Sequence, residues 1–328
     1  MKRARLKKVV VQIVTYNNEQ TIRSCIASIK AQDYFNFDIV VIDNASSDNT
    51  RRIVKKLGVR CIALRENRGY AAGHNVGLKH ANSTYVLTLN PDVVISPMFL
   101  RELVSAMDAA GAPVGSAQAL LYRVEKMTRR SFVVDSAGLC LGPTRRQRLR
   151  YAGRDSRRNA LAQQFIFGPD GAAAFYRRAM LRDIDLGHGI FDEDYFMHKE
   201  DVDICWRAQL RGWKSLFVPR AVGYHIRTFR PGRRENIHRA LRLFAVRNRY
   251  VLMIKNELPA LFFRDVLWII AYEILIFLYI VFRERGSFKA YTQVITLLPS
   301  LLTKRAVIQR NRRVGARDIV MWFRWRPA

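Results

Sequence analysis

Acidic residues are scarce in this sequence. Of its 328 residues, 27 are Asp or Glu and 56 are Lys or Arg, which leaves a formal net charge of +29. The basic residues cluster at 2–8, 145–158, 227–249 and 304–326. Such an excess favours an anionic partner, and nucleic acid, an anionic membrane face and a phosphorylated substrate all qualify. Charge alone does not choose among them, and each cluster could also be a solvated surface patch.

Cysteine is also scarce. The four cysteines stand far apart, with no CxxC pair and no histidine at zinc-ligand spacing. This pattern argues against a disulfide framework and favours buried thiols in a reducing compartment. The basic N-terminus is followed by a short strand-like run, so we expect no signal peptide. Repeats and low-complexity linkers are absent as well.

Two common nucleotide-binding motifs are missing. Gly69, Gly73 and Gly77 are spaced four apart, unlike the dinucleotide fingerprint G-x-G-x-x-G, and no P-loop lysine follows them. We interpret the three glycines as a helix face that lets the backbone approach a ligand closely.

Short apolar runs alternate with helical patterns in the first half of the chain. Strands are predicted at 9–14, 39–42, 59–64 and 85–89, with helices at 21–31, 48–57 and 71–80 between them. A strand at 172–176, a helix at 202–211 and a strand at 214–219 follow a less regular stretch. Alternation of this kind predicts an α/β fold with a mostly parallel central sheet and helices on both faces.

The last eighty or so residues differ in character. Residues 261–282 are nearly all apolar, and the 17 residues from Val266 to Phe282 carry one acid. That length is at the lower edge of what spans a bilayer, so an interfacial or re-entrant helix, a spanning helix and a buried helix all remain open. Basic residues such as Arg283 and Arg285 flank the run and suit anionic headgroups. We therefore predict a domain at 1–240 and a helical, basic, membrane-associating region at 241–328.

Polar residues follow four consecutive predicted strands. They are Thr15 to Glu19, Asp43 to Asp48, Glu66 to Gly69 and Asn90 to Asp92. Ligands of open α/β sheets bind beyond the carboxyl ends of the strands, so this edge suits a nucleotide. Each group alone could be a turn or a helix cap.

The densest cluster of acids lies at 191–203. Six acids fall within the twelve residues from Asp192 to Asp203, in a protein of net charge +29. These carboxylates repel one another unless a metal, a cation or a proton lies nearby. A carboxylate held beside others keeps a raised pKa and can act as a general base.

These motifs together resemble family 2 glycosyltransferases with the GT-A fold, in particular the bacterial rhamnosyltransferase-like branch. The resemblance runs from about Val9 to His225 and continues in the tail from Arg247 to Arg313. The residues that carry it are Val14–Asn17, Val41–Asp48, Glu66–Asn75, Leu89–Asp92, Gly171–Arg178 and Phe191–Arg207.

The resemblance implies a role for each motif. Asp201 would be the catalytic base, with Glu200, Gly171 and Ala172 on the acceptor side. Asp92 would bind Mg²⁺ or Mn²⁺ at the last position of a D-x-D motif. His225, which could equally be structural, would be its second protein ligand. Donor contacts would come from Tyr16, Asn17, Glu19, Asp43, Asn67, Arg68, Gly73, Asn75 and Asn90.

One position departs from the family pattern, because Asn90 replaces the first aspartate of D-x-D. With that departure, we expect an inverting, metal-dependent hexosyltransferase of cell-envelope glycan synthesis at the cytoplasmic face of the inner membrane. Its donor would be a dTDP- or UDP-sugar, with rhamnose favoured, and its acceptor a polysaccharide or lipid-linked saccharide.

Three rival hypotheses remain: a nucleic-acid-binding protein, a glycoside hydrolase and a catalytically silent membrane scaffold. We expect no nucleic-acid partner, because no binding module is present and the 192–203 acids would repel phosphates. A hydrolase would not need the nucleotide edge of the sheet. The set of Asp43, Asp92 and Asp201 argues against a silent scaffold.

Overall fold

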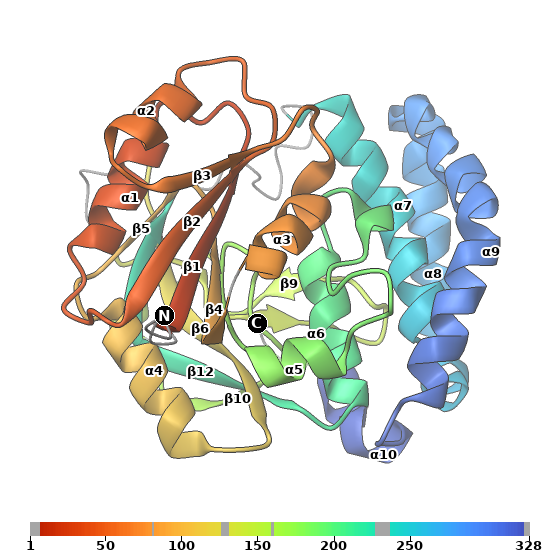
Figure 1. The fold of residues 1–328 in the computed structure, drawn as a ribbon. Coiled ribbons are helices and arrows are strands. Elements are labelled where there is room, and N and C mark those ends of the chain that lie inside the picture. Colours follow the sequence, from red (N-terminus) through yellow and green to blue (C-terminus); the bar gives the residue numbers. More distant parts are fainter. Residues whose placement is uncertain (1–6, 81, 126–130, 159–160, 227–236, 325–328) are drawn as a thin grey trace.

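A ten-stranded mixed sheet forms the centre of the protein (Figure 1). The computed structural model describes residues 7–80, 82–125, 131–158, 161–226 and 237–324. The strand order is β10-β12-β6-β11-β4-β1-β2-β3, with β5 paired to β12 and β7 paired to β6. The strands are β1 Lys7–Thr15, β2 Phe37–Asp43, β3 Arg60–Ala63, β4 Ser83–Leu89, β5 Val93–Ile95, β6 Val114–Arg123, β7 Val134–Ser136, β10 Gln164–Ile166, β11 Ala173–Arg177 and β12 Lys214–His225. A separate two-stranded sheet pairs β8 Leu139–Cys140 with β9 Arg148–Leu149.

The N-terminal half confirms the predicted alternation. Strands β1, β2, β3 and β4 pair in parallel, and helices connect them. Along β1, Val9, Val11 and Ile13 belong to the core on one face, whereas Val10 and Val14 belong to the core on the other. Both faces of the sheet are therefore covered, as its near-continuous apolar strands require. The α-helices before residue 164 are α1 Ile22–Lys30, α2 Thr50–Lys56, α3 Gly69–His80 and α4 Phe99–Ala110. Two further helices, α5 Arg178–Asp183 and α6 Glu200–Leu210, follow later in the chain.

The second half of the sheet is mixed. Strand β11 is antiparallel to β4 and β6, while β12 is parallel to β6. We predicted that the last strand ends at Pro219, but β12 continues to His225 after a register shift between Val218 and Val222. This extension pairs His225 with Val93 of β5. Proline lacks a ladder N–H, but a bulge accommodates it, so the strand continues.

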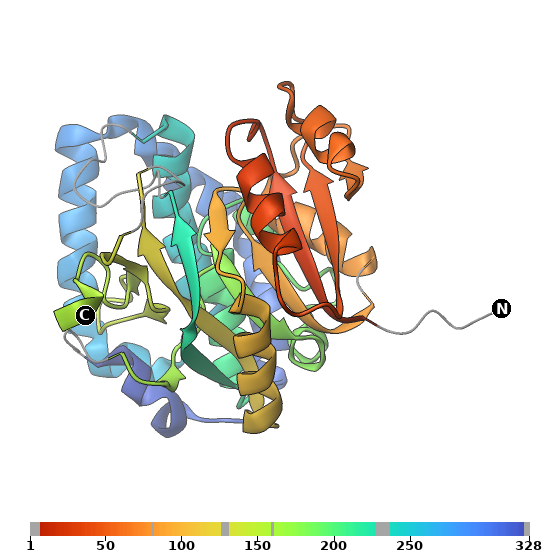
Figure 2. The ribbon, with the colours of Figure 1, turned by 90° about the vertical axis from the view of Figure 1, so that its left-hand side faces the viewer.

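The C-terminal helices pack beside the sheet, on the far side from the N-terminal strands (Figures 1 and 2). They are α7 Arg239–Asn256, α8 Pro259–Arg283, α9 Lys289–Arg310 and α10 Ala316–Ile319. One hydrophobic cluster contains Trp206 of α6 together with Leu252, Leu301 and Phe323. The core is thus continuous across the boundary predicted at residue 240.

Helix α8 exposes most of its apolar surface. Among the described residues it is the one helix long and apolar enough to cross a membrane, and 17% of its most apolar window is buried. Its buried positions, Leu261, Asp265, Ile269 and Ile280, recur along almost its whole length. The exposed large side chains are Phe263, Leu267, Trp268, Ile270, Ile274, Leu275, Phe277, Leu278, Tyr279 and Phe282.

Several arginines of the basic clusters are buried rather than solvated. Arg145 is 2% exposed and its guanidinium lies 2.6 Å from both Glu257 and Asp265. Arg249 is 5% exposed and pairs with Glu273 at 2.6 Å. Arg145 ties α8 to the rest of the protein, and Arg249 joins α7 to α8 and donates to the Thr144 carbonyl at 2.6 Å, so neither charge is available to an anionic partner. Residues 1–6, 227–236 and 325–328 of the clusters lie outside the described residues.

Candidate functional site

Asp43 is the last residue of β2 and is fully buried. Its Oδ2 accepts a hydrogen bond from the Ser46 N–H at 3.0 Å and lies 3.5 Å from Nε of Arg51. Its Oδ1 is buried and has no hydrogen-bond partner among the described residues. A buried carboxylate oxygen without a partner is costly, so this atom is suited to accept an N–H from a ligand.

The loop after β1 is tied to the loop after β2. Asn17, at φ 56°, accepts from the Ser47 N–H at 2.8 Å. The side chain of Tyr16, next to it, is 49% exposed. Glu19 accepts from both the backbone and side-chain N–H groups of Asn49 at 2.9 Å, next to the start of α2. Of the three predicted donor contacts, Asn17 and Glu19 therefore have local partners that stabilise the loop.

The turn before α3 is fixed by its own hydrogen bonds and by Asn44, the residue that follows β2. Asn67 accepts from the Gly69 N–H at 3.0 Å, and the guanidinium of Arg68 lies 3.2 Å from Glu193. Asn44 accepts from the Arg68 N–H at 3.0 Å and donates to the Gly69 carbonyl at 2.9 Å. We had assigned no role to Asn44, although it directly follows Asp43.

The glycines of α3 have a different role from the predicted one. A Cβ on Gly73 would lie 2.7 Å from Val14, and one on Gly77 would lie 2.4 Å from Gln12. At Gly69, φ is +85° and a Cβ would lie 2.4 Å from the Phe196 carbonyl. The interpretation as a face for a ligand was therefore wrong: the partners are strand β1 and the acidic segment. Helical spacing identifies a face but not what packs on it.

Asn75 also supports the acidic segment. It donates to the Phe191 carbonyl at 2.8 Å and accepts from the Phe191 N–H at 2.9 Å. Its side chain donates in addition to Glu193 at 3.0 Å. Both ends of the amide are engaged, so Asn75, predicted to contact the donor, holds protein backbone.

Asp92 and His225, the predicted metal ligands, lie together. The Nε2 of His225 is 3.4 Å from Oδ1 of Asp92, and that Oδ1 is buried without a hydrogen-bond partner among the described residues. The other ring nitrogen, Nδ1, lies 2.9 Å from Oδ2 of Asp135. A carboxylate on one ring nitrogen orients a histidine whose other nitrogen ligates a metal. Asp135 of β7 was missed, because no local motif marks it.

The described residues contain no cluster of three or more His, Cys, Asp or Glu side chains around one metal position. Asn90 is directed elsewhere, since its Oδ1 accepts from the Tyr70 hydroxyl at 2.9 Å. Within the described part of the chain, the side chains at this position are thus Asp92 and His225. The oxygens of a diphosphate and water would complete the coordination of a hard cation.

Tyr70 was also missed, and it connects the two sides of the site. Its hydroxyl is 3.1 Å from the Gly171 carbonyl as well as bonded to Asn90. Burial raises the pKa of Tyr70, and so do the charges of Glu200, Asp201, Asp170 and Asp92. The charges of four carboxylates from three separate segments therefore act on one phenol.

Asp201 lies in the first turn of α6, against the backbone before β11. Its Oδ2 accepts from the Gly171 N–H at 3.0 Å and its Oδ1 from the Val202 N–H at 2.8 Å. Burial, with the nearby Asp170, raises the pKa of Asp201 to about 6. At neutral pH this carboxylate is largely ionised and still basic enough to accept a proton. Ala172, next to Gly171, accepts from the Asn90 N–H at 2.9 Å.

Glu200 differs from its neighbour. Burial, followed by the charge of Asp201, raises the pKa of Glu200 to about 8. Its Oε2 is buried with no hydrogen-bond partner among the described residues. The pair therefore carries close to one negative charge at neutral pH, because two adjacent buried carboxylates resist ionising together.

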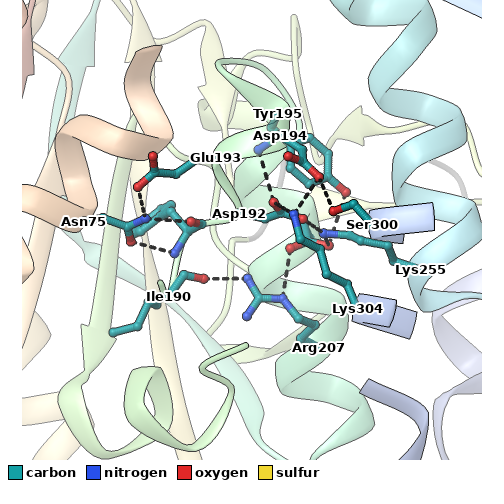
Figure 3. Close-up of polar contacts among 12 residues, drawn as sticks. Asn75, Ile190, Asp192, Glu193, Asp194, Tyr195, Arg207, Lys255, Ser300 and Lys304 are labelled. Atoms are coloured by element: carbon teal, nitrogen blue, oxygen red, sulfur yellow. Dashed lines mark hydrogen bonds and ion pairs between the residues drawn. The ribbon is translucent and has the colours of Figure 1, made fainter. Parts of the chain in front are cut away.

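The remaining acids of the segment are paired with cations. Figure 3 shows Asp192 and Asp194 beside Lys255 and Lys304. Asp192 forms ion pairs with Lys255 and, at 2.6 Å, with Lys304. Asp203 lies 3.0 Å from Lys255 and 2.9 Å from Arg207. Burial opposes ionisation of Asp192, but the two lysines outweigh it and lower its pKa. We predicted a metal, a cation or a proton near these acids, and the protein's own lysines supply the cations.

Known proteins share part of this sequence. The family model described as Glycosyl transferase family 2 matches residues 10–185. The poly-β-1,6-N-acetyl-D-glucosamine synthase of Staphylococcus aureus strain COL is 25% identical over 227 residues, which cover 66% of this chain and 49% of the relative. The synthase of Staphylococcus epidermidis strain RP62A is 26% identical over 220 residues, covering 64% and 48%. The chain spans about half the length of these curated relatives.

Solved structures show the same fold. Residues 1–349 of S. aureus TarS, in complex with UDP-GlcNAc, match with a TM-score of 0.54 and 19% identity over 96% of this chain and 89% of that one. The mannosyltransferase PcManGT of Pyrobaculum calidifontis, in complex with GDP-Man and Mn²⁺, has a TM-score of 0.52 and 19% identity over 94% and 81%. These likenesses establish the GT-A architecture, a mostly parallel sheet with helices on both faces.

Proposed function

Because the chain belongs to glycosyl transferase family 2, we propose that it is an inverting glycosyltransferase of cell-envelope glycan synthesis. It would move a sugar from a nucleoside-diphosphate donor to a polysaccharide or lipid-linked saccharide. One observation carries the proposal: the Tyr70 hydroxyl bonds to Asn90, two residues before Asp92, and to the Gly171 carbonyl, while the Gly171 N–H holds Asp201, whose pKa burial raises to about 6. A metal-binding acid and a base poised near neutrality are what such a transfer needs.

The donor base would bind at Asp43. Its buried, unpartnered Oδ1 can accept the ring N–H of uracil or thymine. The exposed ring of Tyr16 and the loop of Asn17 border the same strand ends. Rhamnose from a dTDP donor is favoured by the resemblance, whereas the name of the curated relatives supports N-acetylglucosamine as the sugar. The TarS structure was solved with UDP-GlcNAc, which adds a UDP-sugar to the candidate donors.

The residues present fit a divalent metal. Asp92 contributes a buried oxygen without a hydrogen-bond partner, and Asp135 orients His225 toward it. A Mg²⁺ or Mn²⁺ ion held by Asp92 and His225 would neutralise charge on the leaving diphosphate. The single carboxylate predicts weaker binding than a full D-x-D motif would give, since ligand charge sets affinity for hard cations.

Asp201 would perform the proton transfer. As the acceptor oxygen forms its bond to the anomeric carbon, its proton passes to an oxygen of Asp201 and the bond from that carbon to the diphosphate breaks. Because this is one displacement, it inverts the anomeric centre. Glu200, largely protonated at neutral pH, leaves the charge of the pair on Asp201. The N–H of Gly171 holds the base in place.

Association with a membrane surface would place the enzyme near a lipid-linked acceptor. The exposed apolar side chains of α8 support this, and so do Arg283 and Arg285 beside them. The buried positions of α8 run from Leu261 to Ile280, so the helix packs on the protein along its length. That packing favours an interfacial helix over a spanning one. The surface it would bind is the cytoplasmic face of the inner membrane.

A thermal-shift screen against dTDP- and UDP-sugars, with and without Mn²⁺, tests the proposal. A donor that binds only the folded protein raises its melting temperature, by an amount that grows with concentration. We expect a metal-dependent shift with one class of sugar nucleotide, followed by transfer with inversion in an NMR assay of the product. Tight binding of duplex DNA with no response to any sugar nucleotide would instead favour the nucleic-acid hypothesis.

A further inference from the structure

Two lysines of the C-terminal helices bind the acidic segment at 192–203. Lys255 of α7 is 0% exposed, and its Nζ contacts Asp192 and, at 3.0 Å, Asp203. The same Nζ lies 4.6 Å from the centre of the Tyr195 ring. In Figure 3, Lys255 and Lys304 approach Asp192 together. A lysine buried this completely is stable only because both of its acids are ionised.

Lys304 of α9 makes the second attachment. Its Nζ lies 2.6 Å from Oδ1 of Asp192 and 2.5 Å from Oδ2 of Asp194. Ser300, one turn earlier on the same face of α9, donates to Asp194 at 3.3 Å. The lysine therefore bridges two acids that would otherwise repel each other.

The backbone between these acids and Asp201 needs such support. Phe196, His198 and Lys199 have φ values of 59°, 73° and 75°, a region that residues other than glycine rarely adopt. Helix α7 contributes further donors here. Asn248 donates to the carbonyls of Tyr195, Met197 and His198 at 2.7–3.0 Å. The strained turn ends directly at Glu200, so its shape sets where α6 begins and where Asp201 points.

We propose that Lys255 and Lys304 are positioning residues for the transfer reaction: they hold segment 192–203 against α7 and α9 and thereby keep Asp201 against Gly171. The inference rests on the proposed function, because it assigns the two lysines a part in that reaction. Neither lysine contacts Asp201 in the structure, so both act through the backbone. Helix α9 exposes Ile295 and Leu302, and its Lys304 contacts the segment that contains Asp201.

Lys304 is the better residue for a test, because it is 12% exposed and its loss leaves Lys255 in place. Lys304→Met removes the charge, and Lys304→Arg keeps it. The matched control is Arg313→Met. Arg313 follows α9 and pairs with Asp183 at 2.8 Å, so it also joins the C-terminal region to the α/β domain, away from the acidic segment.

Two readouts are needed: donor kinetics with the full chain, and hydrogen exchange of the backbone amides at 192–203. In Lys304→Met we expect kcat to fall by about ten- to a hundredfold, because small displacements of a base are costly. Donor KM should stay within about twofold, and exchange across 192–203 should become faster. Lys304→Arg should recover most of kcat, and Arg313→Met should keep the parent kcat and exchange.

The outcomes separate this inference from the proposed function. If the wild type transfers no sugar, the proposed function is overturned, and with it the catalytic part of the inference, even where hydrogen exchange in Lys304→Met becomes faster. An active wild type with unchanged kcat and unchanged exchange in a folded Lys304→Met would overturn the inference alone. A lower melting temperature with parental kcat would also overturn it, since the lysine would then be purely structural.

Discussion

Two groups of acids from one short segment have opposite environments. Asp192 and Asp203 face Lys255, Lys304 or Arg207, and these cations lower the pKa of both carboxyls although burial opposes it. Glu200 and Asp201 lie within the same twelve residues, and burial raises the pKa of both, helped by the charge of Asp201 at Glu200 and by that of Asp170 at Asp201. Sequence proximity therefore does not determine the function of an acid. The cations that reach it do. Arg207 is one helical turn from Asp203, but Lys255 and Lys304 come from helices 63 and 112 residues away from Asp192 along the chain.

The contrast assigns different tasks to the two groups. Ionised, paired acids hold the segment to α7 and α9, and unpaired acids with raised pKa values remain available for proton transfer. Substitutions in each group should therefore differ in what they change. Loss of the base Asp201 should lower activity directly, whereas loss of a lysine that pairs with the first group should lower stability and, through the position of Asp201, kcat as well.

The largest effect is expected for Asp201→Asn. Loss of a positioned base lowers turnover by about two to four decades, whereas donor binding should survive because Asp43 is unchanged. Steady-state kinetics and donor titration measure the two quantities. Asp185→Asn, on an exposed loop, serves as the control and should keep parental activity. Near-parental turnover in Asp201→Asn would remove Asp201 from the role of base.

Lys255→Met should produce the largest loss of stability. It leaves Asp192 and Asp203 buried with fewer cations, and breaking a buried pair in this way costs about 3–5 kcal/mol of unfolding free energy. Chemical denaturation measures the loss. Lys56→Met, at an exposed position of α2, should change stability by no more than about 0.5 kcal/mol. A loss below about 1 kcal/mol in Lys255→Met would contradict the pairing described above.

The pH dependence of kcat/KM should be set by Asp201. A base must be ionised to act, so activity should fall as the pH drops below about 6, approaching tenfold per pH unit. A profile of kcat/KM from pH 5 to pH 9, with donor affinity measured in parallel, locates this fall in activity. The paired acids, with lowered pKa values, should not titrate in that range. Activity that stays constant down to pH 5 would mean that neighbouring acids and burial do not raise the pKa of the base.

Glu200→Gln should produce the mildest change, seen in stability against pH. Burial and the charge of Asp201 raise the pKa of Glu200 from 4.5 to about 8, so the folded state favours its protonated form. Its contribution to stability is complete below pH 4.5 and is lost as the pH rises toward 8. In Glu200→Gln this loss of stability is absent. The unfolding free energies of the two proteins should therefore diverge by at most about 1.4 kcal/mol for each pH unit. Parallel stability curves for the two proteins would contradict the raised pKa.

Local patterns were enough to predict much of the fold. The strands at 9–14, 39–42, 59–64 and 85–89 are confirmed as β1 to β4, because apolar β-branched runs bury on both faces of a parallel sheet. The same logic placed Asp43 and Asp92 at strand ends. It failed for the end of β12, where a bulge carries the strand past Pro219, and for Gly73, whose neighbour is Val14.

The sequence by itself determined the alternating α/β order, the edge of the sheet where polar residues collect and the segment that contains the acids, since each of these is a local pattern. Only the tertiary structure decided that Asp135 orients His225, that Tyr70 joins Asn90 to Gly171 and that Lys255 and Lys304 pair with Asp192. Charged groups interact through space over a few ångströms, whatever their separation along the chain. Which acid ends up paired and which is left basic is therefore decided by packing.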